Sequence, residues 1–159
     1  MSKKEFKTNV MRILDQKKIE YKSHSYADTD ALSGVEVAEA LGENPDRVFK
    51  TLVTQGASKN YFVFMVPVKE ELDLKKAAKS VNEKNIAMIK AKELLPLTGY
   101  VHGGCSPIGM KKQFKITIHH TAKDFDTIYF SAGKIGYQVE TSLTELSKAI
   151  PFELDDIAE

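Results

Sequence analysis

The chain has 159 residues, of which 42% are hydrophobic and 28% charged, and its formal net charge is +1. This composition excludes an intrinsically disordered chain and fits a single domain, residues 1–159, with a sizeable core. No apolar run approaches the roughly 20 residues that cross a bilayer, and no secretory signal is visible, so we expect a cytoplasmic protein without a membrane partner.

The first segments predict two helices with a short strand between them. Residues 21–26 fit the strand, and the helix before it is predicted to end near Lys17 or Lys18, from the apolar stripe of Phe6, Val10, Ile13 and Leu14. The second helix should begin after Ser33, because Ser33 and Glu36 have capping-box spacing, and should stop at Gly42.

Two strongly apolar segments follow the second helix. Residues 48–54 and 61–66 are rich in branched and aromatic side chains and are separated by a short polar stretch, which predicts a β-hairpin. Asp73 can cap a helix over the next residues. A short strand at 86–89 and a short helix closed by Pro96 are expected after it.

The last third contains a glycine-rich loop from Gly99 to Gly109 and then a strand at 114–118. Residues 127–130 and 135–139 predict a strand pair, and Ser142 begins the final helix. Helices and strands are interspersed without regular βαβ alternation. The predicted fold class is therefore α/β of the mixed α+β kind, with a mixed and perhaps curled sheet surrounded by helices.

Positive charge is unevenly distributed along the chain. Two stretches are rich in basic residues, Lys3 to Lys22 and Lys111 to Lys134, whereas the C-terminal tail is acidic. This asymmetry permits a basic face for nucleic-acid phosphates, but by itself it is more typical of lysines on an ordinary solvated surface.

Lys50 is the most conspicuous candidate for chemistry. It lies inside an apolar strand, on the same side as Val48 and Leu52. Such a lysine either reaches solvent with its tip or points into a polar cavity. In the second case its ammonium group could hold a phosphate or stabilise negative charge that develops on a carbonyl oxygen.

Two loops rich in small residues are the next candidates. The loop from Gly99 to Gly109 can bring backbone N–H groups close to a substrate, but it lacks the lysine spacing of a P-loop. The segment from Tyr129 to Gly136 contains Ser131, for which no activating partner is evident. Each loop could also be a purely structural turn.

Cysteine and histidine give weaker indications. The lone Cys105 cannot form an internal disulfide, and no paired base supports it as a nucleophile. The four histidines do not have the spacing of a zinc site. We therefore expect no metal and no cofactor.

Taken together, four segments of the chain resemble the YbaK/EbsC family. They are Val48–Leu52, Leu74–Ala78, Gly99 to Gly109 with Lys111 and Lys112, and Ser131–Lys134. Their order along the chain is also that of the family, whose similar members include free-standing Cys-tRNA(Pro) deacylases and the editing domain of bacterial prolyl-tRNA synthetase.

The resemblance implies a barrel-like sheet and a particular set of site residues. It implies that Lys50 is the essential lysine. The substrate-binding residues that it implies are Tyr26, Thr51, Gly103, Gly104, Ser106, Pro107, Ser131 and Gly133. Two positions depart from the family: Cys105 stands at a usually apolar position, and Ser33 stands where some members have a pocket phenylalanine.

The implied activity is hydrolysis of mischarged Cys-tRNA(Pro). The implied partner is tRNA, with prolyl-tRNA synthetase as a second candidate partner, and no DNA binding is implied. A pocket that accepts proline cannot firmly reject cysteine or alanine, so a second hydrolytic site is needed for accuracy. The substrate thiol could itself attack the ester, while N–H groups near Gly103 and Gly104 receive the oxyanion. Ala-tRNA(Pro) or broader deacylation, and a non-catalytic tRNA-binding module, are the alternatives.

Overall fold

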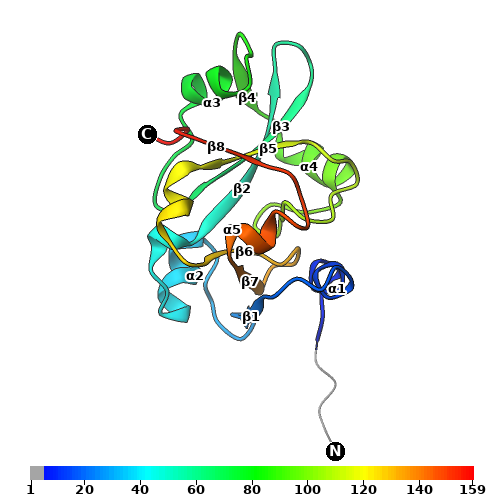
Figure 1. Ribbon diagram of the computed structural model, residues 1–159, viewed down its shortest axis with the longest axis vertical. Coiled ribbons are helices and arrows are strands. Elements are labelled where there is room, and N and C mark those ends of the chain that lie inside the picture. The colour runs from blue at the N-terminus through cyan, green and yellow to red at the C-terminus, as the bar shows by residue number, and fades with distance from the viewer. Residues whose placement is uncertain (1–5) are drawn as a thin grey trace, which may run out of the picture.

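The computed structural model describes residues 6–159. Its larger sheet has five strands in the order β4-β2-β3-β5-β8 (Figure 1). The strands are β2 (Phe49–Gly56), β3 (Tyr61–Pro67), β4 (Ile86–Met88), β5 (Lys115–His119) and β8 (Glu153–Asp155). β2 pairs antiparallel with both β3 and β4, whereas β3–β5 and β5–β8 are parallel pairs. The predicted hairpin and the predicted mixed sheet are confirmed.

A second, antiparallel sheet has the order β1-β7-β6. Its strands are β1 (Lys22–Ser25), β6 (Ile128–Ser131) and β7 (Tyr137–Thr141). An isolated bridge between Val48 and Tyr129 connects the two sheets beside the start of β2. The mixed α/β class is confirmed, but the barrel-like curl that the resemblance implied is not.

Three helices begin at the caps that the sequence indicated, which are Ser33, Asp73 and Ser142. The α-helices are α1 (Asn9–Gln16), α2 (Gly34–Leu41), α3 (Leu74–Ser80), α4 (Ala91–Thr98) and α5 (Leu143–Leu146), with short 3₁₀ helices at Pro45–Arg47 and His120–Asp124. Ser33 and Glu36 form the predicted capping box of α2, and Asp73 caps α3. No helix within residues 6–159 is long and apolar enough to cross a membrane.

Several details differ from the sequence predictions. Phe6, which was expected on the apolar stripe of the first helix, precedes α1 and is 49% exposed. Pro96 lies inside α4 rather than closing it, and the helix continues to a left-handed cap at Gly99. The loss of one N–H is tolerated there because Leu94 is anchored in the main core. Strand β8 was not predicted, and the final helix, α5, spans only four residues.

Strand β3 separates two hydrophobic clusters. Val63 and Met65 face the main core, which includes α1 and the three-stranded sheet, whereas Phe62, Phe64 and Val66 face α3 and the C-terminal segment. Because β3 is buried on both faces, its sequence is almost continuously apolar rather than alternating. This rigid centre supports the neighbouring strand β2, on which Lys50 lies.

Candidate functional site

A cavity of about 560 Å³ lies where the start of β2 meets the β6–β7 sheet, the segment before α2 and the glycine-rich loop. Apolar side chains form part of its lining, including those of Val37, Phe49, Leu94 and Phe130. Polar groups come from five different segments: Lys50, Thr51, Ser33, His102, Ser131 and Gln138. An apolar cavity with a few converging polar groups is typical of a small-molecule or substrate site.

Five of the predicted site residues line this cavity. They are Tyr26, Lys50, Thr51, Gly103 and Ser131. Although these residues are widely separated in sequence, the packing of β2 against the second sheet brings them together. Ser33 is the N-cap of α2 and also lines the cavity.

The other four predicted residues are not among those that line the cavity. Gly104, Ser106 and Pro107 are buried within the loop, and Ser106 Oγ accepts the N–H of Ile108 at 3.3 Å. Gly133 has φ +90°, and a Cβ there would lie 2.8 Å from Val10 and 3.0 Å from Tyr100. These four residues therefore pack behind the cavity wall and do not form its inner surface.

Internal hydrogen bonds hold the glycine-rich loop in place. Tyr100 donates its hydroxyl to the carbonyl of Ile108, and Thr98 Oγ1 accepts the N–H of Tyr100 at 3.1 Å. The N–H of Gly104 donates to the carbonyl of Val101 at 3.0 Å, so it is not available as the oxyanion donor that we expected. Within residues 6–159, the N–H groups of Gly103 and Cys105 make no hydrogen bond.

Lys50 occupies the boundary between the cavity and solvent. Its side chain retains 28% of its full exposure, and its Nζ lies 3.8 Å from Oε1 of Glu71. Both interpretations of the sequence are therefore partly right, since the side chain lines the cavity while its tip reaches water. An ammonium in this position can interact with an anionic group at the cavity mouth.

Gln138 is a polar cavity residue that the sequence analysis missed. It lies on β7, is only 3% exposed, and its Oε1 has no hydrogen-bond partner within the described residues. Thr51 Oγ1, also buried, is unpaired as well. Because an unpaired buried polar atom is costly, such atoms in a cavity indicate where a ligand supplies the missing partner. The sequence did not indicate Gln138 as a site residue, because a single polar residue is ordinary in an alternating strand.

Cys105 lines the cavity, but its thiol is not activated. Burial raises the pKa of Cys105 to about 12. The thiol is therefore protonated near neutral pH, and it is the thiolate that acts as a nucleophile. The closeness of Cys105 to the site reflects packing of the loop into the core.

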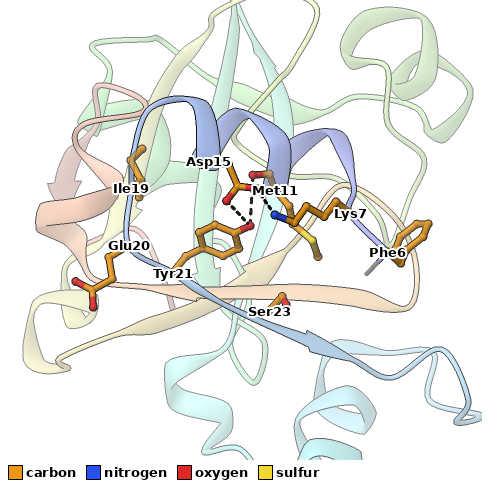
Figure 2. A pocket seen from close by; sticks show the side chains of 8 residues that line it. All are labelled: Phe6, Lys7, Met11, Asp15, Ile19, Glu20, Tyr21 and Ser23. Atoms are coloured by element: carbon orange, nitrogen blue, oxygen red, sulfur yellow. Dashed lines mark hydrogen bonds and ion pairs between the residues drawn. The ribbon is translucent and has the colours of Figure 1, made fainter. Parts of the chain in front are cut away.

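A second hollow, of about 330 Å³, lies between α1 and β1 (Figure 2). Asp15 accepts hydrogen bonds there from Lys7 Nζ at 2.6 Å and from Tyr21 Oη at 3.0 Å. The Lys7 hydrogen bond is the main cause of the lowered pKa of Asp15. None of the predicted site residues lines this hollow.

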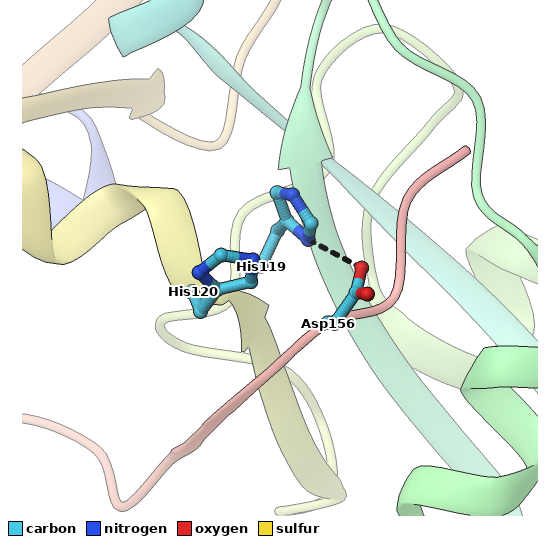
Figure 3. Close-up of side chains that lie close together, drawn as sticks. All are labelled: His119, His120 and Asp156. Carbon is cyan, nitrogen blue, oxygen red and sulfur yellow. Dashed lines mark ion pairs between the residues drawn. The ribbon is translucent and has the colours of Figure 1, made fainter.

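His119, His120 and Asp156 form a cluster of potential metal ligands (Figure 3). In this structure, however, ligand atoms of His119 and Asp156 have other partners. Nδ1 of His119 accepts the N–H of Ile157 at 3.2 Å, and Lys76 Nζ lies 3.1 Å from the Asp156 carboxylate. The Lys76 ammonium already supplies the positive charge, so the cluster is better described as an anchor for the C-terminal segment (residues 153–159).

The basic stretches are only partly visible in the structure. Lys3 and Lys4 lie outside the described residues. In the second stretch all five lysines are exposed: Lys111, Lys112, Lys115, Lys123 and Lys134. Lys111 and Lys112 follow directly in sequence after the glycine-rich loop, part of which lines the cavity.

Comparison with known proteins gives consistent matches. The model of the family described as "Aminoacyl-tRNA editing domain" matches residues 29–149. A protein of Enterococcus faecalis, EbsC, described as a candidate Cys-tRNA(Pro)/Cys-tRNA(Cys) deacylase, is 47% identical over 135 residues, which cover 84% of this chain and 82% of that protein.

Solved structures share the fold at low sequence identity. One is described as a candidate trans-editing enzyme for prolyl-tRNA synthetase; it has a TM-score of 0.80 and 21% identity, with 96% of this chain and 98% of that chain covered. Another, the hypothetical protein APE2540, has a TM-score of 0.83 and 18% identity, with 94% and 99% covered. Both structures show that the whole arrangement of strands and helices is shared.

Proposed function

The chain belongs to the aminoacyl-tRNA editing domain family, and from that premise we propose that it hydrolyses mischarged Cys-tRNA(Pro). The observation that bears most on this proposal is the position of Lys50, which lines a cavity shared with Thr51, Tyr26, Gly103 and Ser131. Lys50 is the predicted essential lysine, and the other four are the predicted substrate-binding residues that line the cavity. The activity of EbsC in its description is the same deacylation.

The reaction requires little beyond positioning and charge stabilisation, because the aminoacyl ester is already activated. A nucleophile adds to the ester carbonyl, and the bond to the ribose oxygen then breaks, so that the tRNA leaves with a free hydroxyl. Lys50 would interact with the terminal nucleotide or the carbonyl oxygen. The unpaired N–H groups of Gly103 and Cys105 are candidate donors to the oxyanion.

Two nucleophiles can be considered for this reaction. Water would release free cysteine, whereas the substrate's own thiol would close a ring on the carbonyl and release a thiolactone. We favour the substrate thiol over water, because its attack on the carbonyl is intramolecular. Within the protein, Cys105 is protonated and Ser131 Oγ accepts the N–H of Gly133 at 3.1 Å. Neither side chain is thus prepared to act as the nucleophile.

The acceptor end of tRNA is the partner that this reaction requires. The exposed lysines that follow the glycine-rich loop would contact its phosphates. We further propose that the protein acts in the cytoplasm beside prolyl-tRNA synthetase, which would supply the mischarged substrate. The description of the solved trans-editing structure supports this association.

A deacylation assay tests the proposal. The native protein is incubated with tRNA(Pro) charged with cysteine, alanine or proline, and loss of the ester is followed. We expect fast loss of cysteine, and we expect Lys50→Ala to reduce the rate about 10²–10³-fold, as for loss of one group that stabilises developing charge. Lys50→Arg retains the charge and should lose less.

Other outcomes of this assay would identify the alternatives. Preferred loss of alanine would make the protein an Ala-tRNA(Pro) deacylase. Binding of tRNA without turnover by the native protein would make it a non-catalytic module. Equal rates for serine and cysteine esters on tRNA(Pro) would contradict the thiol mechanism but not the deacylase activity.

A further inference from the structure

Lys50 has one carboxylate beside it, and that carboxylate lies outside the cavity lining. Glu71 Oε1 is 3.8 Å from Lys50 Nζ, and the Glu71 side chain is 78% exposed whereas that of Lys50 is 28% exposed. Within residues 6–159 Lys50 makes no other ion pair. The ammonium at the cavity mouth is therefore partly neutralised by an anion that extends into solvent.

The backbone of Glu71 is held in place although its side chain is exposed. Its carbonyl accepts the N–H of Glu159 at 3.1 Å, and the next residue, Leu72, forms a β-bridge with Ala158. The N–H of Asp73 donates to the carbonyl of Ile157 at 2.8 Å. The C-terminal segment thus fixes the loop that presents the carboxylate to Lys50.

The C-terminal segment is itself firmly anchored. Strand β8 pairs with β5, and Ile157 is fully buried with its N–H bonded to His119. Lys76 Nζ donates both to the Asp156 carboxylate and to the carbonyl of Ala158 at 3.0 Å. The backbone of Glu71 is therefore held in place by tertiary contacts with the C-terminal segment.

From these contacts we infer that Glu71 is a built-in counter-ion for Lys50 that competes with an anionic phosphate of the substrate's 3′ end. This inference rests on the proposed function. In the free protein, Glu71 keeps the ammonium oriented toward the cavity mouth. When the substrate binds, a phosphate takes the place of the carboxylate, and Glu71 turns into solvent.

The geometry of the pair suits such an exchange. At 3.8 Å the two groups are beyond hydrogen-bond distance, and one of them is mostly hydrated. Exposed ion pairs of this kind contribute little to stability, so the carboxylate can be displaced without unfolding the loop. Glu71 acts through Lys50 and is a positioning residue, not a catalytic one.

Steady-state kinetics of Glu71→Gln on Cys-tRNA(Pro) tests the inference. Removal of the competing charge should lower KM about two- to fivefold, the range that corresponds to one exposed ion pair, and leave kcat unchanged. Adenosine 5′-monophosphate, used as a probe of phosphate binding by calorimetry, should bind more tightly by a similar factor. Glu71→Asp retains the charge and should resemble the native protein.

Glu153→Gln is the matched control. It makes the same change in net charge on β8, three strands away from β2 in the sheet. An equal fall in KM for Glu153→Gln would reveal a general charge effect and overturn the inference, as would a fall in kcat at unchanged KM for Glu71→Gln. If the native protein does not hydrolyse any ester, the proposed function fails, whereas tighter binding of the probe by Glu71→Gln would still support the counter-ion.

Discussion

At the scale of single residues, Gln138 has a buried side-chain oxygen, Oε1, that a substrate could pair with. This Oε1 has no hydrogen-bond partner among residues 6–159, and Gln138 lines the cavity. Behind it, burial raises the pKa of Glu43, and the neighbouring Gln138 amide offsets part of that increase. A substrate N–H or O–H would satisfy the oxygen, and the α-ammonium of an aminoacyl ester is such a donor.

We expect Gln138→Leu to reduce kcat/KM about 10- to 100-fold, since hydrogen bonds to charged groups contribute about 1.5–3 kcal/mol. The same change removes the hydrogen bond between the Gln138 side chain and the partly buried Glu43 carboxyl, so the free energy of unfolding should fall by about 1–3 kcal/mol. Deacylation kinetics and urea denaturation measure the two effects.

Gln55→Leu is the control for this substitution, because Gln55 is at the far end of β2 and its amide donates to the carbonyl of Lys59 at 3.1 Å. It should leave the kinetics unchanged. Native kinetics in Gln138→Leu would show that the amide does not contact the substrate.

At the scale of elements, helix α2 connects stability with the shape of the cavity. Val35 and Val37 from α2 line the cavity, and the helix begins at the capping box of Ser33 and Glu36. Ser33 Oγ accepts the N–H of Glu36 at 3.1 Å, and Glu36 accepts the N–H of Ser33 at 2.9 Å. One serine thus both caps the helix and forms part of the cavity wall.

Ser33→Ala should lower the free energy of unfolding by about 1 kcal/mol, the usual contribution of an N-cap side chain. The urea midpoint measures this loss. Ser23→Ala, at an exposed position on β1, is the comparison and should change the midpoint little. Equal midpoints for the two variants would mean that the cap does not limit the stability of α2.

At the scale of the whole molecule, the C-terminal segment joins the larger sheet to α3 and to the loop that contains Glu71. The buried His119 is central to this connection, because its Nδ1 accepts the N–H of Ile157. Burial lowers the pKa of His119, His120 acts in the same direction, Glu70 and Asp156 oppose the shift, and Lys76 adds a smaller lowering effect. The neutral imidazole is the form that anchors the segment.

The stability of the protein should therefore fall in mild acid. The unfolded chain takes up a proton on this histidine near its ordinary pKa of 6.5, whereas the folded protein does so only at lower pH. The contribution of His119 is thus complete above pH 6.5 and is lost as pH falls toward the lowered pKa. Protonation also places a hydrogen on Nδ1, where the Ile157 N–H must be accepted.

Urea denaturation between pH 7.5 and 5 measures this dependence. His119→Gln should be less stable than the native protein at pH 7.5 but should lose less stability on acidification. His102→Gln, at an exposed position, should keep the native slope. If the free energy of unfolding of His119→Gln depended on pH as strongly as that of the native protein, other groups would be responsible for the acid sensitivity.

The sequence by itself determined the local elements and the most visible site residue. Caps at Ser33, Asp73 and Ser142 and the apolar hairpin strands are local signals, because a helix start or a buried strand depends on neighbouring residues. Lys50 was visible because a charge interrupts an apolar strand. The roles of the predicted site residues and the extent of the domain, residues 1–159, remain predictions.

Only the tertiary structure decided which residues face the cavity and which support it. Gly104, Ser106, Pro107 and Gly133 share segments with lining residues but are not among them, and the Gly104 N–H is used within its own loop. Gln138 and Glu71 acquire their places only because β7 and the C-terminal segment pack beside distant parts of the chain. A contact between residues far apart in sequence leaves no local pattern, since it depends on how already formed elements pack together.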